Sequence, residues 1–294
     1  MRIGVTGASG MLGTAIVAHL SKLHKVFATS RSKGIEGKNV TWNCFDLTNA
    51  KTLNNWLVKI KPDVIIHCAA IVNIDFCEDN PTLATKLHIN TTEIISKYLD
   101  STDGKLIYIS TDSVFDGSKS RPYKESDSTN PLNVYAKTKL LGETPVLSMN
   151  KGLVLRTNIV GSSRGVRLSF SEWILKGLKE NLVLNLFYDV KFSPLSVYDL
   201  SMIIENIINN PIFGLYHCAS SDSISKYHFG IEMADFFQLP VSMIKRVSID
   251  DMDFKANRSK NMALDIKKIS LALKYRFPNS LESIKSIQHQ HSSN

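Results

Sequence analysis

The stretch Val5-Thr6-Gly7-Ala8-Ser9-Gly10-Met11-Leu12-Gly13 places three glycines three residues apart, between a short apolar strand and a helical segment. One glycine permits a tight turn, another lets the backbone approach a pyrophosphate, and a third allows the helix to pack closely on the strand. The helix N-terminus adds free N–H groups and the positive end of its dipole. The pattern favours dinucleotide binding over an ordinary strand–helix turn, through Gly7, Ser9, Gly10, Met11, Leu12 and Gly13.

Strand-like and helix-like segments alternate along the first half of the chain. Short apolar runs predict the strands, and helical spacing predicts the helices between them. Residues 63–68 are almost continuously apolar, as expected for a strand covered on both faces of its sheet. The alternation predicts an α/β fold with a doubly wound parallel Rossmann sheet. The expected strands are 2–6, 25–29, 40–44, 63–68, 105–110 and 152–156, and the expected helices are 11–23, 51–61, 82–100 and 134–144.

Beyond Gly161 the pattern loosens into helical stretches separated by short apolar runs, and these stretches cover residues 170–179, 197–209 and 226–237. We expect a dinucleotide-binding domain over 1–161, rejoined by about 190–218, and a smaller C-terminal substrate-binding lobe over 162–189 and 219–285. Residues 286–294 are polar, and a frayed tail is expected there.

The composition is that of a globular, cytoplasmic protein. Its 294 residues are 43% hydrophobic and 21% charged, which allows a sizeable core. No apolar run is long enough for a membrane span, the N-terminus lacks the apolar segment of a signal peptide, and the four cysteines form no CxxC pair. The net charge of +8 suits small anionic ligands better than nucleic acid, because the lysines are dispersed. No His, Cys and Asp cluster has metal-ligand spacing, so no catalytic metal is expected.

The end of the second expected strand bears on the choice between NAD and NADP. A cofactor with free ribose hydroxyls is usually held there by Asp or Glu. This chain reads Thr29-Ser30-Arg31-Ser32-Lys33, with two cations and no acid. A 2′-phosphate suits these side chains, so we expect NADP, as NADPH, with Arg31 as a ligand and NAD as the alternative. The other interpretation makes Arg31 and Lys33 solvated loop charges.

A tyrosine and a lysine stand four residues apart in Tyr135-Ala136-Lys137-Thr138-Lys139. On a helix they share one face, about 6 Å apart along the axis. We expect Lys139 to lower the pKa of Tyr135 toward neutrality, so that Tyr135 protonates a carbonyl oxygen as hydride reaches its carbon. Thr111, at the carboxyl end of a strand, can hydrogen-bond the same oxygen. The alternative is an ordinary amphipathic helix face.

Three segments carry a family resemblance: the glycine loop, Ser110-Thr111-Asp112-Ser113-Val114-Phe115-Asp116-Gly117, and the Tyr135–Lys139 segment with its trailing Leu140-Leu141-Gly142-Glu143. Together they resemble extended short-chain dehydrogenases/reductases, and most of all the dTDP-4-dehydrorhamnose reductase family. Later segments around Arg156, Pro194 and Arg258 are similar to that family as well. The resemblance therefore runs from Met1 to about Leu273.

The resemblance implies NADPH-dependent reduction of a nucleotide-activated 6-deoxy-4-keto sugar for surface polysaccharide synthesis. It implies that Thr111, Tyr135 and Lys139 are catalytic. Arg258 would approach the substrate diphosphate, and it is equally interpretable as a surface cation. Substrate contacts are implied for Thr111, Asp112, Ser113, Asn158 and Arg258. Cofactor contacts beyond the glycine loop and Arg31 are implied for Asp46, Leu47, Cys68, Ala69, Ala70, Asn90, Ser110, Tyr135 and Lys139, with Asn90 helping to organise the lysine.

Two positions depart from the family and leave the exact sugar open, and the sequence does not identify the nucleotide. Ser113 stands where an aromatic residue is usual, and Ile159 aligns with a usual tryptophan. Two other functions stay open, namely an epimerase or dehydratase of the same superfamily and a non-catalytic NADP-binding regulatory subunit. A dehydratase would need an acid/base pair beside Thr111, but no Glu follows Asp112. A homodimer stays open as the assembly.

Overall fold

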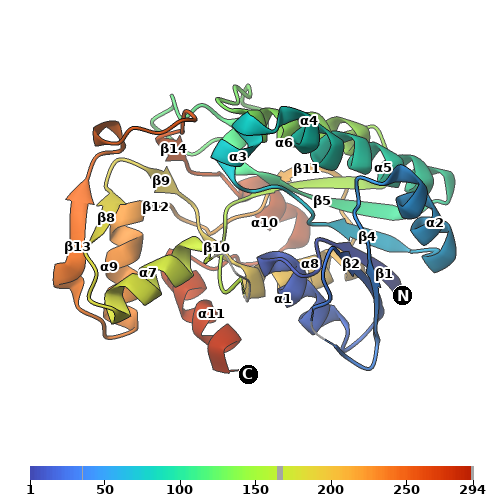
Figure 1. Cartoon of the computed structure of the whole chain (residues 1–294), viewed down its shortest axis with the longest axis horizontal. Coiled ribbons are helices and arrows are strands. Elements are labelled where there is room, and N and C mark those ends of the chain that lie inside the picture. The colour runs from blue at the N-terminus through green and yellow to red at the C-terminus, as the bar shows by residue number, and fades with distance from the viewer. Residues whose placement is uncertain (35, 164–167, 293–294) are drawn as a thin grey trace.

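The computed structural model describes residues 1–34, 36–163 and 168–292. Its centre is a seven-stranded sheet in the order β11-β6-β5-β4-β1-β2-β3, and every pairing within it is parallel (Figure 1). The predicted α/β class and the doubly wound parallel sheet are confirmed. The strands are β1 (Arg2–Thr6), β2 (Lys25–Ser30), β3 (Val40–Cys44), β4 (Val64–His67), β5 (Lys105–Thr111), β6 (Gly152–Thr157) and β11 (Gly214–His217).

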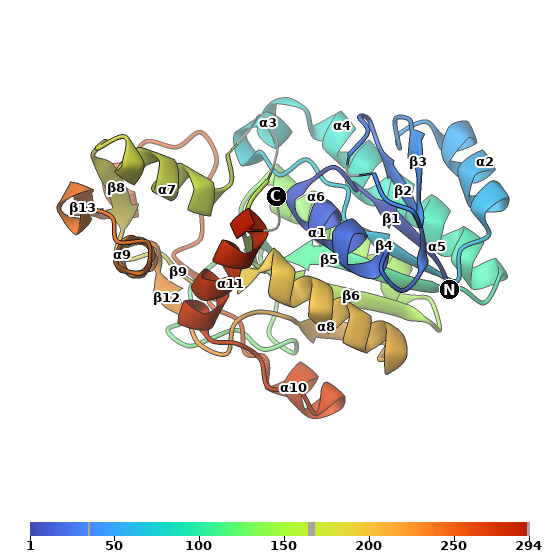
Figure 2. The same cartoon turned by 90° about the horizontal axis from the view of Figure 1, so that it is seen from below.

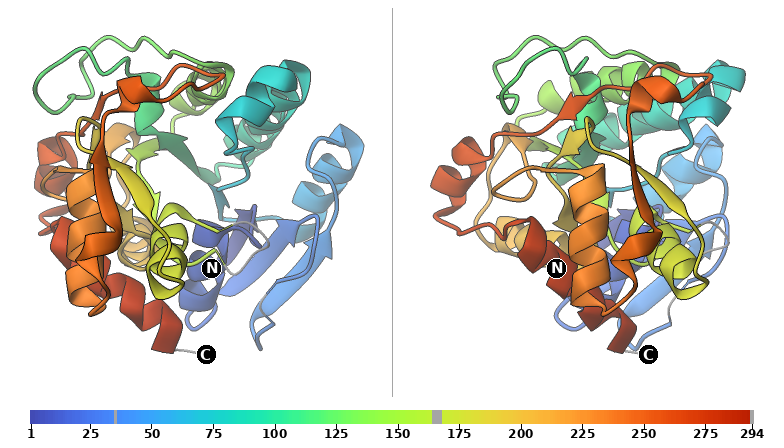
Figure 3. Two further views of the ribbon diagram at one scale, coloured as in Figure 1. Left: turned by 60° about the vertical axis from the view of Figure 1, so that its left-hand side comes forward. Right: turned by 90° about the vertical axis from the view of Figure 1, so that its left-hand side faces the viewer.

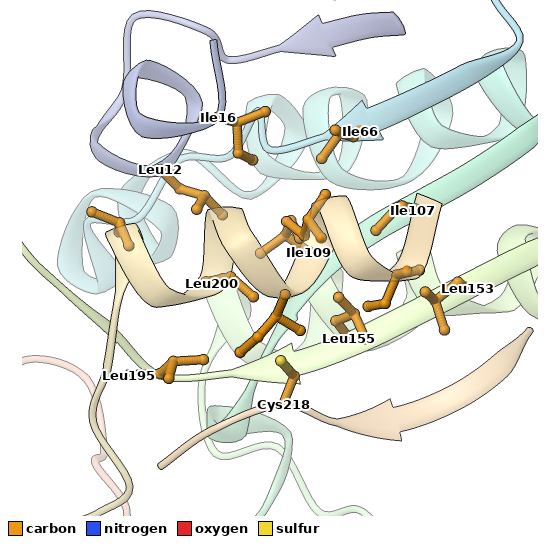
Figure 4. Close-up of a cluster of buried hydrophobic side chains, with 14 of the residues drawn as sticks. Leu12, Ile16, Ile66, Ile107, Ile109, Leu153, Leu155, Leu195, Leu200 and Cys218 are labelled. Atoms are coloured by element: carbon orange, nitrogen blue, oxygen red, sulfur yellow. The ribbon is translucent and has the colours of Figure 1, made fainter. Parts of the chain in front are cut away.

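Helices cover both faces of this sheet, which explains why its inner strands are almost entirely buried and mostly apolar. On one face lie α1 (Met11–Leu20) and α8 (Val197–Asn209), which pack side by side (Figure 2). Figure 4 shows their buried side chains against strand residues such as Ile107 and Leu155. The other face is covered by α2 (Ala50–Ile60), α5 (Thr91–Ser101) and α6 (Val134–Leu147).

The chain reverses its direction of travel across the sheet between β1 and β4. From β1 it passes outward through β2 to β3, and it then crosses back to β4 and continues outward to β5 and β6. Ligands of open α/β sheets bind beside the carboxyl ends of the strands at such a reversal. The fold therefore directs attention to the loops that follow β1, β4 and β5.

A smaller group of elements lies at the end of the molecule opposite β3 and α2 (Figures 1 and 3). Its side chains form a separate buried cluster around Leu178, Leu186, Phe192 and Phe229. In it β8 pairs with β13, and β9 lies between β12 and β14. These elements are α7 (Phe170–Lys179), β8 (Leu184–Phe187), β9 (Lys191–Phe192), β12 (Ile224–Ser225), α9 (Lys226–Phe236), β13 (Ile244–Val247) and β14 (Asn261–Met262).

Several short elements complete the fold. They are β7 (Ile159–Val160), which pairs with β10 (Leu195–Ser196), α3 (Ile74–Asp79), η2 (Asp112–Val114), η3 (Val241–Met243), η4 (Ile249–Asp251) and α10 (Lys267–Leu273). Ile269 of α10 packs with the main sheet cluster, although the sequence analysis placed it with the lobe. No helix among the described residues is long and apolar enough to cross a membrane.

The C-terminal residues differ from the expected frayed tail. They belong to α11 (Ser280–Ser292), whose Ile284 and Ile287 are buried in the lobe cluster. Ser286 Oγ donates a hydrogen bond to Asp199 Oδ1 at 2.9 Å. The helix forms because two apolar residues three positions apart gain a core, despite their polar surroundings. Residues 293–294 of the expected tail lie outside the described residues.

The expected long helix over 82–100 is interrupted near its middle. It consists of α4 (Pro81–Thr85), a π-helical turn η1 (Lys86–Asn90) and α5. A π-helical turn inserts one extra residue per turn and rotates the side chains that precede it relative to those that follow. This rotation decides which side chain of the segment reaches the site described next.

Candidate active site

The loop after β1 is built for close approach of two backbone segments. Gly7 has a positive φ of 63°, and a Cβ atom there would lie 2.7 Å from the backbone of Ala69. A Cβ atom on Gly13 would lie 2.2 Å from the Gly7 carbonyl oxygen, so only glycine lets α1 pack on this turn. The two glycines therefore permit the close backbone packing that a phosphate-binding loop requires.

The start of α1 offers unused backbone donors. Gly10 is the N-cap and has no side chain that could cap the helix, and no acidic residue lies in the first turn. The first intrahelical hydrogen bond runs from Thr14 N to Gly10 O at 2.9 Å. The N–H groups of Met11, Leu12 and Gly13 precede it and can bind an anion at the positive end of the helix dipole.

The basic end of β2 contains one ion-paired and one unpaired cation among the described residues. Lys33 forms an ion pair with Glu36, whereas Arg31 is exposed and no ion pair is found for it. Asp46, at the end of β3, accepts hydrogen bonds from Thr48, which lower its pKa, and the charge of Arg31 contributes a smaller effect. Arg31 is therefore the cation of this loop that is available to a phosphate.

The segments expected around the adenosine follow β3 and β4. Leu47 and Ala69 are buried, and Cys68 and Ala70 are partly buried. Burial raises the pKa of the Cys68 thiol to about 12, so this cysteine is a small apolar wall and not a nucleophile. The carboxyl ends of β1 to β4 thus bring the expected cofactor residues to one edge of the sheet.

The helix α6 starts beside this edge and carries Tyr135 and Lys139. Asn133 caps it by accepting a hydrogen bond from Ala136 N at 2.9 Å, and Glu78 accepts one from Val134 N at 2.7 Å. The Thr111 hydroxyl at the end of β5 lies close enough to Tyr135 to lower its pKa by hydrogen bonding. The structure therefore brings two of the three expected catalytic side chains close together.

Lys139 lies one turn further and is buried. Its Nζ donates to the Ile109 carbonyl oxygen at 2.7 Å and lies 3.9 Å from the centre of the Tyr108 ring. Burial lowers the pKa of Lys139 to about 7, and Glu143 opposes that shift. A lysine with this pKa can exchange its proton near neutrality.

The pKa of Tyr135 is raised, whereas a lowered pKa was expected. Burial raises it to about 12, and the hydrogen bond with Thr111 only partly opposes the effect. On an isolated helix the Lys139 ammonium would dominate the pKa of Tyr135, but in the fold that ammonium is directed to the Ile109 carbonyl. Tyr135 therefore keeps its proton at neutral pH in this state.

Asn90 and His88 take different places in their segment. The Asn90 side chain is exposed at the end of the π-helical turn, whereas His88 is fully buried and its ring meets that of Tyr135 edge-on at 5.9 Å. His88 Nε2 accepts from Ile71 N at 2.9 Å, so its Nδ1 carries the proton donated to Thr138 Oγ1 at 2.8 Å. His88 is thus the residue of this segment that braces the catalytic helix.

The Ser110 side chain is engaged within the protein. Its hydroxyl is buried and donates to Glu143 Oε1 at 2.5 Å, so it is committed to the protein interior. Successive residues of a strand point to opposite faces, and Thr111 takes the face of Tyr135. The Ser110 side chain therefore connects β5 to α6 through its hydrogen bond with Glu143.

The substrate side expected around Asp112 forms a connected polar group. Asp112 is buried and accepts hydrogen bonds from Asn158 Nδ2 at 2.5 Å, Thr111 Oγ1 at 3.2 Å and Ser113 Oγ at 3.3 Å. Burial raises its pKa, and Lys226 of α9 lowers it by its charge. Sequence reasoning missed Lys226. Its one visible signal was a cation in the first turn of an expected helix, where the dipole disfavours it.

Arg258 is neither a free surface cation nor an unpaired ligand. Its Nη2 lies 3.3 Å from Asp75 Oδ2, and its guanidinium lies 4.1 Å from the centre of the Phe254 ring. Its Nε is buried with no hydrogen-bond partner among the described residues. Arg258 therefore joins the segment before β14 to α3 beside the site. Within the described residues, no three His, Cys, Asp or Glu side chains gather as metal ligands.

A family model described as RmlD substrate binding domain matches residues 1–292. The chain belongs to this family. The expected resemblance is thereby confirmed, and the RmlD-type chain has the fold of an extended short-chain dehydrogenase/reductase.

Relatives of this RmlD-type chain include a regulatory subunit and reductases. The beta subunit of methionine adenosyltransferase 2 from Xenopus laevis is 32% identical over 288 residues, covering 90% of this chain and 80% of the relative. The dTDP-4-dehydrorhamnose reductase of Salmonella typhimurium is 30% identical over 241 residues, covering 80% and 78%. A crystal structure of dTDP-4-dehydrorhamnose reductase from Bacillus anthracis in complex with NADP has a TM-score of 0.85 and is 25% identical, covering 98% and 99%. The reductase relatives support a sugar-nucleotide oxidoreductase.

Proposed function

We propose that this chain is a cytoplasmic, NADPH-dependent reductase of a nucleotide-activated 6-deoxy-4-keto sugar, acting in surface polysaccharide synthesis. The observation that carries the proposal is the proximity of Tyr135 to Thr111, one turn from buried Lys139, at the sheet edge that also holds the glycine loop. The reductase relatives support the reaction class.

The residues of the edge fit a phosphorylated dinucleotide. Gly7 and Gly13 leave the space that a Cβ atom would fill, and the first N–H groups of α1 are free to bind phosphate. Arg31, exposed directly after β2, would bind a 2′-phosphate. When bound, NADPH would supply the hydride that reaches the carbonyl carbon.

The chain's own residues manage the proton. Tyr135, with a pKa raised to about 12, is loaded with a proton at neutral pH. Together with Thr111 it would hydrogen-bond the carbonyl oxygen, and it would give its proton to that oxygen as negative charge develops there. The protonated form of Lys139 would then stabilise the phenolate.

A second function is favoured by one observation. The 32% identity to the methionine adenosyltransferase beta subunit extends over 90% of this chain, so the whole fold also suits a regulatory subunit. In that case Thr111, Tyr135 and Lys139 would bind NADP without a catalytic cycle. The two functions differ in turnover and not in cofactor binding.

The deciding experiment is NADPH oxidation by the purified chain against dTDP-, UDP-, GDP- and CDP-linked 4-keto sugars. We expect turnover with at least one of them, and Tyr135→Phe should abolish it. Titration of NADPH in parallel separates the functions. Tight NADPH binding without turnover on any sugar would reject the reductase and favour the regulatory subunit.

A further inference from the structure

Lys226 occupies an electrostatically unfavourable place beside the candidate site. It is the first residue of α9, directly after the N-cap Ser225, where the positive end of the helix dipole opposes a cation. Its charge acts on Asp112, which adjoins Thr111. Both the helix dipole and burial disfavour the charged form of a lysine at this position. A partner that stabilises the ammonium is therefore expected.

Aromatic rings hold the Lys226 ammonium in position. Its Nζ lies 3.5 Å from the centre of the Phe192 ring and 4.3 Å from that of Phe170. Phe192 is fully buried, and its ring also packs against Phe229. The faces of two rings attract a cation without using its N–H donors, so they fix the place of the charge and leave its hydrogen bonds free.

The three N–H donors of Lys226 find no hydrogen-bond acceptor within the part of the chain that the structure describes. Asp112, its charged neighbour, already accepts hydrogen bonds from Asn158, Thr111 and Ser113. Burial lowers the pKa of Lys226 to about 8 and raises that of Asp112, as expected for two charges withdrawn from water. The Lys226 side chain is only partly buried, so these donors are open to a ligand that enters the site.

The balance of charge indicates what satisfies them. The charges of Lys226 and Asp112 act on each other without a direct ion pair among the described residues, so a second anion would be attracted by Lys226 and repelled by Asp112. A neutral group rich in oxygen acceptors meets no such conflict. The adjoining Thr111 and Tyr135 mark where a carbonyl group would lie, which places these donors beside the same sugar ring.

We propose that Lys226 determines sugar specificity by donating hydrogen bonds to an oxygen substituent of the sugar whose carbonyl group meets Thr111 and Tyr135. This inference rests on the proposed nucleotide-sugar reductase. The Phe170 and Phe192 rings position the ammonium, and Asp112 keeps the subsite selective for neutral sugars over sugar acids. The nucleoside diphosphate makes no contact with Lys226.

The test compares Lys226→Met with Lys191→Met. Methionine retains the unbranched apolar stem beside the rings, and Lys191 is an exposed lysine next to Phe192 that serves as the matched control. Calorimetric titration measures dTDP and dTDP-rhamnose binding to the NADPH-loaded protein. Where the wild type binds another nucleotide better, the UDP, GDP or CDP pair with its sugar conjugate is used.

We expect Lys226→Met to weaken the sugar conjugate about 10-fold or more, as for a lost hydrogen bond to a charged group, and to leave the free diphosphate and NADPH within about 2-fold. In turnover it should raise KM for the keto sugar more than it lowers kcat. Lys191→Met should change neither ligand. An unchanged affinity for the conjugate, or an equal loss for conjugate and diphosphate, would overturn the role assigned to Lys226 but not the proposed function. A wild type that binds NADPH but none of the conjugates would instead overturn the proposed function, and this inference with it.

Discussion

Arg156 and Glu143 form a two-point ion pair in the interior, with Arg156 Nε and Nη2 donating to the two carboxylate oxygens at 3.0 and 2.7 Å. Arg156 lies on β6 directly across from Ser110 of β5, which donates to the same carboxylate. Glu143 lies one helical turn beyond Lys139. The pair therefore fixes the rotation of α6 over the two strands and, with it, the direction of the catalytic side chains.

Removing the carboxylate charge should destabilise the whole domain. Glu143→Gln would leave the Arg156 guanidinium buried without its counter-charge, and one broken partner of a buried pair costs about 3–5 kcal/mol. Urea unfolding measures the loss. A double variant, Glu143→Leu with Arg156→Met, removes both charges and should recover much of that stability. If Glu143→Gln unfolds at the wild-type urea concentration, the pair does not position α6 in the way described.

Tyr135→Phe tests the proton transfer directly. The phenyl ring preserves the edge-on contact with His88, so folding and NADPH affinity should stay near the wild-type values. The rate of the chemical step should fall about 10²–10⁴-fold, as for loss of a positioned general acid. Single-turnover kinetics on the sugar that the wild type reduces gives this number. Near-normal reduction by the variant would show that another group supplies the proton.

Lys139→Met should stabilise the protein although it removes a site residue. The unfolded chain holds the lysine proton up to about pH 10.4, whereas the folded chain releases it at about 7, so the charged lysine costs stability below both values. The cost is fully present below pH 7 and disappears as pH rises toward 10.4. We expect a gain of about 2–4 kcal/mol at pH 6, after discounting the lost hydrogen bond to Ile109.

Thermal unfolding at several pH values measures this gain, with the exposed Lys137→Met of the same helix as control. The difference between Lys139→Met and the wild type should shrink steadily from pH 7 to pH 10. A pH-independent difference would mean that the lost contacts of Lys139, and not its buried charge, govern the effect. Either variant leaves the sheet core untouched.

Local patterns predicted most of the sheet and the glycine loop, because their determinants lie within a few residues of each other. Gly7 and Gly13 need only a strand before them and a helix after them. The place of His88 beside Tyr135 was not expected. A single π-helical turn changes which residue of the segment faces Tyr135, and no local preference in the sequence marks that turn.

Lys226 and the C-terminal helix escaped prediction for a related reason. The rings that hold Lys226 come from residues 170 and 192, and only tertiary packing brings them together. Ile284 and Ile287 sit among polar residues, and their helix gains its stability from a cluster assembled by distant segments. The depressed pKa of Lys139 likewise depends on burial that a helical wheel does not show.

Arg31 provides the test of cofactor choice. It is the exposed cation at the end of β2 that has no ion-pair partner among the described residues, whereas Lys33 is paired with Glu36. Arg31→Ala should weaken NADPH by about 10-fold or more, because it removes a charge-assisted contact with the 2′-phosphate, and it should leave NADH unchanged. Lys33→Ala is the matched control and should have a smaller effect, since its charge is already neutralised. Calorimetric titration of both cofactors against the three proteins decides the matter. Equal weakening of NADPH and NADH by Arg31→Ala would assign Arg31 to general loop structure, and equal wild-type affinities for the two cofactors would remove the preference for NADP altogether.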